Sequence, residues 1–133
     1  MEKNIIIIEE DEILKKLLSF HISDYFNNQA NITFFDKTKI DQILISEKLD
    51  ILLINCLQIY DNLKKLEEIE TRKTKNIIII FNNSDDRYNN KNFIKYKFVI
   101  KPFTFKNLFS IISSFYSNVD GVDEPKIFLM RPL

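Results

Sequence analysis

Acidic, amide and basic side chains stand directly after short apolar runs in this sequence, and they are the residues whose types could do chemistry. Glu9, Glu10 and Asp11 follow the first run, Asn55 follows the third and Lys101 follows the last. Carboxylates bind cations, a lysine neutralises neighbouring acids, and an amide carries neither a negative charge nor a free nucleophilic lone pair. If the runs are parallel strands, these side chains lie together beyond the carboxyl ends of the strands.

Apolar periodicity predicts the elements that would place these residues. Short runs rich in Ile and Phe are expected to be buried strands, and stretches with apolar residues three and four apart are expected to be helices. Residues 82–92 are crowded with Asn, Asp and Lys, so any helix there is expected to be short or frayed. The predicted strands are residues 4–8, 31–35, 51–54, 77–81 and 98–100, and the predicted helices are residues 11–26, 38–48, 60–71 and 104–117.

The alternation of strands and helices predicts the fold class. Continuous apolar strands are typical of a parallel sheet covered on both faces, and right-handed crossovers leave few arrangements. We therefore expect an α/β protein with a three-layer, doubly wound, five-stranded parallel sheet. The inward face of the first helix is predicted to hold Leu14, Leu17, Leu18, His21, Ile22 and Tyr25.

Composition narrows the function classes. The chain has 133 residues, of which 45% are hydrophobic and 29% charged, and this balance is typical of one soluble globular domain. Its 19 basic and 19 acidic residues cancel, so nucleic-acid binding is not expected. No apolar run is long enough to span a bilayer and the N-terminus lacks the pattern of a secretory signal, so we expect a cytoplasmic protein without a membrane segment.

Residue types that occur only once exclude further classes. The single glycine, Gly121, excludes the usual glycine-rich phosphate loop and dinucleotide-binding turn. The single histidine, His21, excludes a two-histidine metal motif and is expected to be a structural helix residue. The single cysteine, Cys56, cannot form an internal disulfide, which agrees with a reducing compartment, and it is expected to be inert.

Three segments, in order and at suitable spacing, carry a resemblance to a known family. The most specific is FVIKPF at residues 98–103, in which Lys101 at the end of a strand precedes a proline and an aromatic residue; the others are IIIIEED at residues 5–11 and DILLIN at residues 50–55. Together they resemble the receiver domain of two-component response regulators. The resemblance implies a flavodoxin-like receiver fold for residues 1–117. The C-terminal tail at residues 118–133 contains the apolar run 127–130 and is expected to dock through a short strand; the alternative is the stump of an effector domain.

The chain departs from the family at its phosphorylation site, so it resembles a degenerate pseudo-receiver. Asn55 stands where the family has the aspartate that accepts a phosphoryl group, and an amide cannot form an acyl phosphate. Glu10 stands at the family's key metal-binding aspartate, and its longer side chain suits a small octahedral Mg²⁺ site poorly. Glu9, Glu10 and Asp11 are therefore expected to form a degenerate acidic pocket without a cofactor, in which Glu9 and Glu10 are the candidates for any weak cation binding.

Two aromatic residues occupy positions that the family uses for switching. Phe81 falls where the family has a threonine or serine that hydrogen-bonds the phosphoryl group, and a shift of one residue would put Asn82 there instead. Phe98 corresponds to the switching aromatic, and Phe81 is expected to fill the space into which Phe98 would move. Lys101, which contacts the phosphoryl group in the family, is expected to lie beside the degenerate acidic pocket.

Each candidate also has a plainer structural interpretation. The three acids suit the positive end of a helix, and Asn55 suits a turn after a strand. Lys101 could be a surface lysine before a proline, and Phe81 a packed aromatic residue.

The resemblance and its departures predict a pseudo-receiver that acts by protein contact, without phosphorylation and without enzymatic activity. The expected partner is a signalling protein such as a histidine kinase or another response regulator, and residues 82–117, the family's output face, are a candidate homodimer surface. Alternatives are a working receiver with another acceptor such as Glu9 or Glu10, the remnant of a DNA-binding response regulator, and an unrelated flavodoxin-like enzyme. The neutral net charge weighs against DNA binding, and the lack of a phosphate-cradling loop after the first strand weighs against the flavodoxin-like enzyme.

Overall fold

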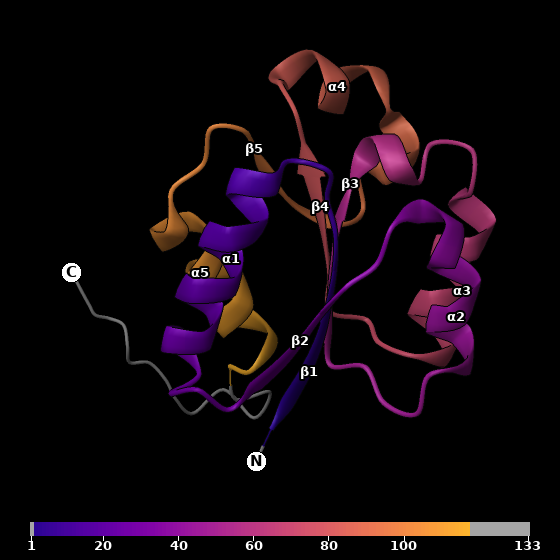
Figure 1. The fold of residues 1–133 in the computed structure, drawn as a ribbon. Helices are drawn as coiled ribbons and strands as arrows, with labels where there is room; N and C mark the ends of the chain where they lie inside the picture. Colours follow the sequence, from indigo (N-terminus) through magenta and orange to yellow (C-terminus); the bar gives the residue numbers. More distant parts are fainter. Residues whose placement is uncertain (1, 118–133) are drawn as a thin grey trace. The chain divides into compact units, whose positions relative to one another are not determined.

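Five parallel strands form a sheet in the computed structural model, which describes residues 2–117 (Figure 1). The strands are β1 Lys3–Ile8, β2 Ala30–Phe34, β3 Ile51–Asn55, β4 Ile77–Phe81 and β5 Lys97–Ile100. Their order across the sheet is β2-β1-β3-β4-β5, so the direction of winding reverses between β1 and β3. In sheets of this kind the functional site lies beyond the carboxyl ends of the strands at that reversal.

Two compact units make up the chain, and the division falls between Phe103 and Thr104. The first unit contains the sheet with α1 Glu12–Tyr25, α2 Ile40–Ile45, α3 Leu63–Arg72 and α4 Ser84–Asn89, together with short 3-10 helices at Lys37–Lys39, Cys56–Gln58 and Lys91–Phe93. The described part of the second unit is α5 Phe105–Phe115. Within residues 2–117, no helix is long and apolar enough to cross a membrane. The predicted boundary between a domain and a tail stays a prediction, because residues 118–133 lie outside the described residues.

Helices cover both faces of the sheet within the first unit. The helix α1 lies on one face, and α2 and α3 lie together on the other (Figure 1). Alternate residues of a strand point to opposite faces. Ile6 and Ile8 of β1 accordingly belong to one buried cluster with Ile40 of α2 and Leu66 of α3. This three-layer, doubly wound parallel sheet confirms the predicted fold class.

Short polar side chains set the ends of the helices that border the sheet edge. Asp11 caps α1 by accepting hydrogen bonds from two first-turn N–H groups, at 3.0 and 3.1 Å. Asn83 caps α4 in the same way at 2.8 Å. After α1, Asn27 and Asn28 adopt φ values of 55° and 63°, a left-handed conformation that asparagine tolerates better than most residues. Local sequence therefore fixes where α1 and α4 begin and where the chain turns back into β2.

The predicted elements are present, but several boundaries differ. The helix predicted at residues 38–48 is a 3-10 turn followed by α2, which ends at Ile45 because the backbone of Ser46 is extended. The helix predicted at residues 60–71 begins at Leu63, after a 3-10 turn that follows β3. Residues 82–92 contain α4, which is six residues long and therefore short as expected.

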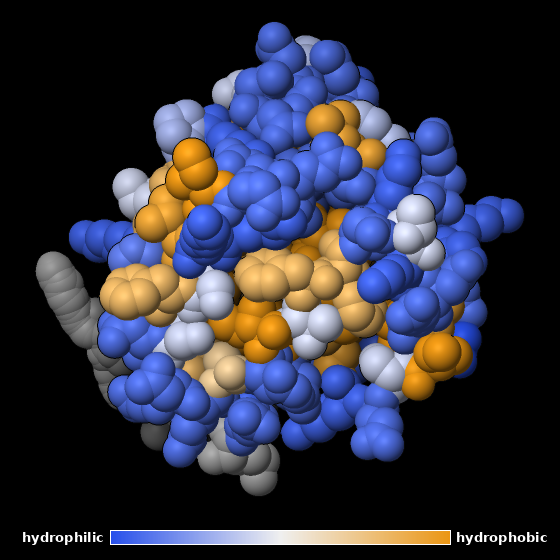
Figure 2. Space-filling view, viewed as in Figure 1, coloured by the Kyte–Doolittle hydropathy of each residue, from blue (hydrophilic) through white to orange (hydrophobic). Residues whose placement is uncertain are grey.

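The outer surface of α1 is more apolar than predicted. Leu18 and Ile22 are buried, but Leu17 is 43% and Tyr25 is 38% exposed, so the prediction that both point inward was wrong. Successive helical residues are about 100° apart, which puts Leu17 at the border of the buried stripe, and Tyr25 is the last residue of the helix. Figure 2 shows apolar side chains gathered over α1 and β2 on an otherwise mostly hydrophilic face.

Phe81→Ala is expected to lower the free energy of unfolding by about 3–5 kcal/mol, because it deletes a fully buried ring that packs against Phe93 and Phe98. Urea denaturation followed by circular dichroism measures the loss. Phe20→Ala is the matched control: this ring is 69% exposed. Its removal is expected to cost less than about 1 kcal/mol. Equal losses in the two variants would contradict the placement of Phe81 in the core.

Candidate functional site

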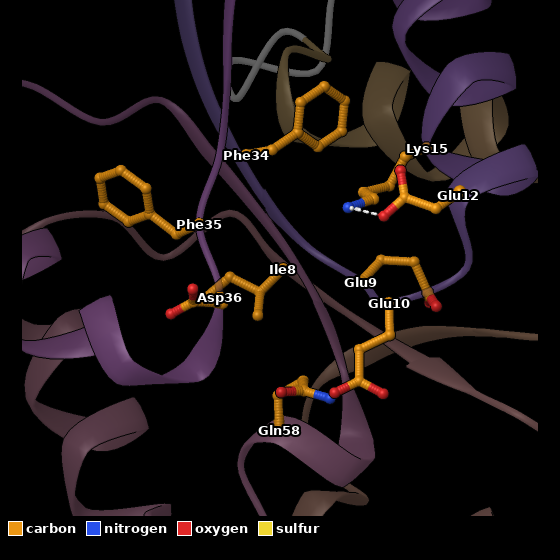
Figure 3. A pocket seen from close by; sticks show the side chains of 9 residues that line it. All are labelled: Ile8, Glu9, Glu10, Glu12, Lys15, Phe34, Phe35, Asp36 and Gln58. Atoms are coloured by element: carbon orange, nitrogen blue, oxygen red, sulfur yellow. Dashed lines mark ion pairs between the residues drawn. The ribbon is translucent and has the colours of Figure 1, made fainter.

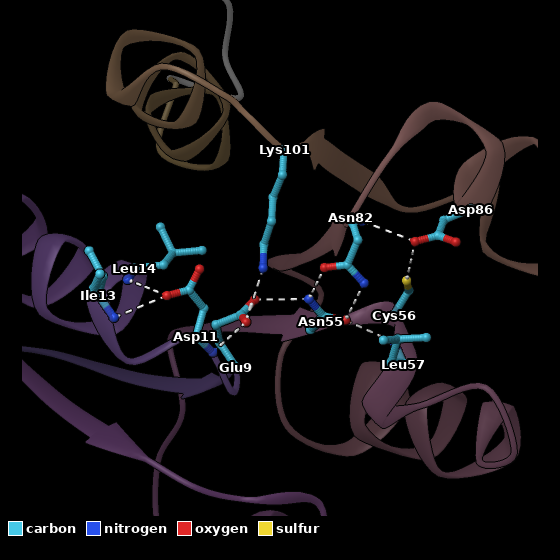
Figure 4. A network of polar contacts seen from close by, with 10 residues as sticks. All are labelled: Glu9, Asp11, Ile13, Leu14, Asn55, Cys56, Leu57, Asn82, Asp86 and Lys101. Carbon is cyan, nitrogen blue, oxygen red and sulfur yellow. Dashed lines mark hydrogen bonds and ion pairs between the residues drawn. The ribbon is translucent and has the colours of Figure 1, made fainter.

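The carboxyl ends of four strands bring four polar side chains together (Figure 4). Glu9 follows β1, Asn55 ends β3, Asn82 follows β4 and Lys101 follows β5. The parallel register of the strands carries all four residues to the same edge of the sheet. The site is therefore built by strand pairing between segments that are far apart in sequence.

Glu9 is the centre of this cluster, and its side chain is only 3% exposed. The Lys101 Nζ lies 3.1 Å from Glu9 Oε2, and the backbone N–H of Asp11 donates to the same oxygen at 2.9 Å. The Asn55 Nδ2 donates to Glu9 Oε1 at 2.9 Å. A buried carboxylate is strongly destabilising unless charged and hydrogen-bonding partners compensate it. Here one ammonium and two N–H groups converge on the two carboxylate oxygens.

Asn55 is 3% exposed, and both ends of its amide are engaged. Its Nδ2 donates to Asn82 Oδ1 at 2.9 Å as well as to Glu9, and its Oδ1 accepts from the Leu57 N–H at 2.9 Å. An aspartate in this place would set a second carboxylate against Glu9, and two like charges in one site repel. The amide replaces that repulsion with a hydrogen bond.

At the end of β4, Asn82 faces the site and Phe81 does not. The amides of Asn82 and Asn55 exchange hydrogen bonds of 2.9 and 3.4 Å. Phe81 is 1% exposed and belongs to the buried cluster between the sheet, α2 and α3. Of the two alignments that the sequence allowed, the structure therefore places the polar residue beside Asn55, and Phe81 is a packed aromatic residue.

The three acids after β1 do not form one pocket. Only Glu9 turns toward Asn55 and Lys101. Asp11 uses its carboxylate to cap α1, which is the plainer interpretation of that acid. Glu10 is exposed and lines a hollow that Glu9 also borders. Lys101 was expected beside Glu9 and Glu10, and it contacts only Glu9. Successive residues of an extended chain point to opposite sides, so Glu10 does not face Lys101.

Phe98 lies between two side chains that hold its ring. The Phe81 ring packs edge-on against it, with 6.0 Å between the centroids. The Arg87 guanidinium carbon lies 3.9 Å from the Phe98 centroid on another side, at the distance of a cation–π contact. The sequence marks Arg87 only as one of two basic residues, with Lys91, in a stretch rich in Asn and Asp.

Cys56 is fully buried directly beneath the site. Its Sγ lies 3.5 Å from the Tyr60 hydroxyl and 3.9 Å from Asp86 Oδ2. Burial raises the pKa of the Cys56 thiol above its ordinary value. Because the thiolate is the reactive form, this environment makes Cys56 a poor nucleophile at neutral pH.

Comparisons with known proteins identify the fold. No family model matches this chain, and no curated protein matches it. A response regulator from Thermotoga maritima superposes with a TM-score of 0.67 at 16% identity, covering 86% of this chain and 97% of that one. The inactive form of the regulatory domain of RitR, the repressor of iron transport regulator, superposes with a TM-score of 0.67 at 20% identity. The match covers 86% of this chain and 94% of that one. The receiver domain of TorR, the TMAO respiratory system response regulator, superposes with a TM-score of 0.64 at 17% identity. The match covers 86% of this chain and 96% of that one. The chain therefore has the fold of response-regulator receiver domains, and at these identities the likeness concerns the fold.

Lys101→Met is expected to destabilise the protein through Glu9, whose carboxylate would stay buried without its cation. The free energy of unfolding at neutral pH is expected to fall by about 1–3 kcal/mol. The double variant Glu9→Gln/Lys101→Met removes both charges and is expected to recover most of the loss. Lys97→Met, at an exposed lysine of β5, is the control and is expected to change stability by less than about 0.5 kcal/mol. Strictly additive effects of the two single substitutions would rule out the coupling.

Proposed function

We propose that this chain is a pseudo-receiver, a two-component signalling module that acts by binding another protein and does not accept a phosphoryl group. The observation that supports this most is Asn55, which ends β3 and hydrogen-bonds Glu9 and Asn82. Its amide nitrogen has a delocalised lone pair and no negative charge, so it offers no nucleophile toward phosphorus. The module is accordingly proposed to have no enzymatic activity.

We also propose that the site holds no resident Mg²⁺. Mg²⁺ requires oxygen ligands in a near-octahedral arrangement. Both Glu9 oxygens already accept hydrogen bonds, and Asn55 presents its Nδ2 toward Glu9, which is a donor and not a ligand. The Lys101 ammonium supplies the positive charge that a cation would otherwise bring. Within residues 2–117, no three His, Cys, Asp or Glu side chains are grouped as metal ligands.

The same contacts favour a single signalling state. Lys101 is tied to Glu9, and Phe98 is held between Phe81 and Arg87. An inward movement of Phe98 would have to displace the packed Phe81 ring, which close packing opposes. We propose that the protein presents one constant surface to a histidine kinase or another response regulator in the cytoplasm. Residues 82–117 are the proposed contact region, also for a homodimer.

A second candidate function is a working receiver that is phosphorylated on Glu10. The Glu10 carboxylate is exposed and makes no hydrogen bond or ion pair within the described residues, so it is accessible, unlike that of Glu9. An acyl phosphate on Glu10 would form without the metal and lysine contacts that stabilise the reaction in a receiver. We favour the pseudo-receiver for that reason, and peptide mapping after treatment with a phosphodonor separates the two.

The wild-type protein is expected to show no mass increase after incubation with acetyl phosphate and Mg²⁺, because neither Asn55 nor the engaged Glu9 is a nucleophile. Intact-mass spectrometry measures the outcome. In the double variant Asn55→Asp/Asn82→Thr, the first substitution introduces a carboxylate and the second a hydroxyl at positions that face the site. Asn55→Asp alone introduces only the carboxylate and is the partial control. A phosphoryl group on the wild type that hydroxylamine removes would refute the proposed function.

Millimolar Mg²⁺ is expected to raise the melting temperature of the wild type very little. A ligand at its dissociation constant adds about 0.4 kcal/mol of stability, and a site without free oxygen ligands should gain less. Thermal denaturation in MgCl₂ and in NaCl of equal ionic strength makes the comparison. Asn55→Asp is the matched variant, in which Mg²⁺ is expected to stabilise more. A large magnesium-specific rise in the wild type would mean that Glu9 and its neighbours rearrange into a metal site.

A further inference from the structure

A second hollow lies beside Glu9, and neither Asn55 nor Lys101 lines it (Figure 3). The chain turns after β1, β2 and β3 and the first turns of α1 line it, and its volume is about 320 Å³. Ligand pockets range from about 300 to 1,000 Å³, so this one suits a single side chain or a similarly small group. It was not predicted from the sequence.

Gln58 is the most unusual residue of this pocket. The residue is only 6% exposed, its amide atoms reach the surface of the pocket, and its side chain makes no hydrogen bond in the part of the chain that the structure describes. Buried polar side chains nearly always have a partner. The Gln58 amide points into the pocket toward the Glu10 carboxylate, which is exposed and equally without a partner among residues 2–117 (Figure 3). The Gln58 amide can donate and accept hydrogen bonds, and the Glu10 carboxylate can only accept them. Both groups therefore face the same space without a hydrogen-bond partner.

The pocket has an excess of negative charge. It is lined by the acidic residues Glu9, Glu10, Glu12 and Asp36 and by one basic residue, Lys15, although the Glu9 carboxylate is turned toward Asn55 and Lys101. Lys15 pairs with Glu12 at 2.9 Å. Lys101 pairs with Glu9 and Lys39 attracts Asp36, so Glu10 is the pocket carboxylate that lacks a cation partner among residues 2–117.

Asp36 stays anionic at neutral pH. Its carboxylate accepts hydrogen bonds from the hydroxyl and the N–H of Thr38, where it caps a 3-10 turn. The hydroxyl hydrogen bond from Thr38, the largest cause, holds the pKa of Asp36 below its ordinary value. Asp36 thus adds charge at the rim of the pocket, while Glu10 and Gln58 supply the groups that a ligand would contact.

A guanidinium group matches these features better than other cations do. It is planar and carries five donors, so it can donate to the Glu10 carboxylate and the Gln58 Oε1 together. Its weakly hydrated face also stacks on aromatic rings, and the Phe34 ring lines the pocket, 39% exposed, with the Lys15 Nζ 5.8 Å from its centroid. An ammonium group is compact and strongly hydrated. A metal ion lacks a set of three grouped ligands within residues 2–117.

We propose that this pocket binds an arginine side chain presented by a partner protein. The inference rests on the proposed contact function, because it names the chemistry of a partner, and it adds a contact site outside residues 82–117. It concerns a different set of side chains from the phosphoacceptor position, and its test does not depend on whether the protein is phosphorylated.

The first test is binding of a blocked pentapeptide with a central arginine between glycine and serine residues. NMR titration of the ¹⁵N-labelled full chain follows the side-chain amide of Gln58 and the backbone amide of Glu10. Saturable shifts are expected in the millimolar range, with at least about fivefold weaker binding of the same peptide carrying lysine. The uncharged analogue with citrulline is expected to cause no shift. Equal affinity for lysine and arginine, or no shift of the Gln58 amide, would overturn the proposal.

Surface variants make the test specific. Glu10→Gln removes one charge-assisted partner and is expected to weaken binding about tenfold. Lys15→Gln frees the Glu12 carboxylate and is expected to tighten it. Glu47→Gln changes the net charge equally at an exposed glutamate outside the pocket, and it is expected to bind like the wild type. Unchanged binding in Glu10→Gln, or weakened binding in Glu47→Gln, would also reject the site.

Gln58→Met tests the buried amide. It preserves the length of the side chain without its hydrogen-bonding groups, and it is expected to reduce the preference for arginine over lysine. Circular dichroism shows whether this variant folds, and the Glu10→Gln result stands if it does not. If the wild type forms an acyl phosphate but still binds the arginine peptide, only the proposed function is rejected. If it forms no acyl phosphate and does not bind the arginine peptide, only the pocket assignment is rejected.

Discussion

A carboxylate buried at the carboxyl edge of the sheet, that of Glu9, constrains the side chains around it. Water cannot solvate it, so the protein must supply positive charge and hydrogen-bond donors from nearby segments. Lys101 supplies the charge from the end of β5, and Asn55 supplies a donor from the end of β3. These three residues come from strands that are separated by many residues in sequence, and only the assembled sheet brings them together.

That requirement explains why an amide suits the end of β3. A second carboxylate would share one cation with Glu9, while the Asn55 amide donates to Glu9 and to Asn82 at the same time. The arrangement is well satisfied without a metal ion or a phosphoryl group. Among the described residues, the charge and the hydrogen bonds of Glu9 are balanced by Lys101 and Asn55. The Phe81 ring packs edge-on against Phe98, and close packing of this kind opposes an inward movement of the Phe98 ring.

Two neighbouring glutamates have different environments as a result. Glu9 turns inward and is neutralised, and Glu10 turns outward into a pocket where the buried Gln58 amide also lacks a partner. The two sites share one loop after β1 but differ in electrostatics. The inner cluster is internally compensated, whereas the outer pocket keeps uncompensated negative charge. An interaction module would use the second kind of surface, because unsatisfied groups gain most from a complementary partner.

The sequence by itself determined the order of the strands and helices, the fold class and the presence of an amide, Asn55, at the end of β3. These follow from local periodicity and residue type, which do not depend on distant contacts. Only the tertiary structure decided that Asn82 and not Phe81 meets Asn55, and that Glu10 leaves the site. The positions of Arg87 and Gln58 were also decided there, as were the ends of α2 and the exposure of the outer side of α1. The physical reason is that a side chain beyond the end of a strand takes its direction from the loop backbone and from the register of neighbouring strands, and both are set by long-range pairing.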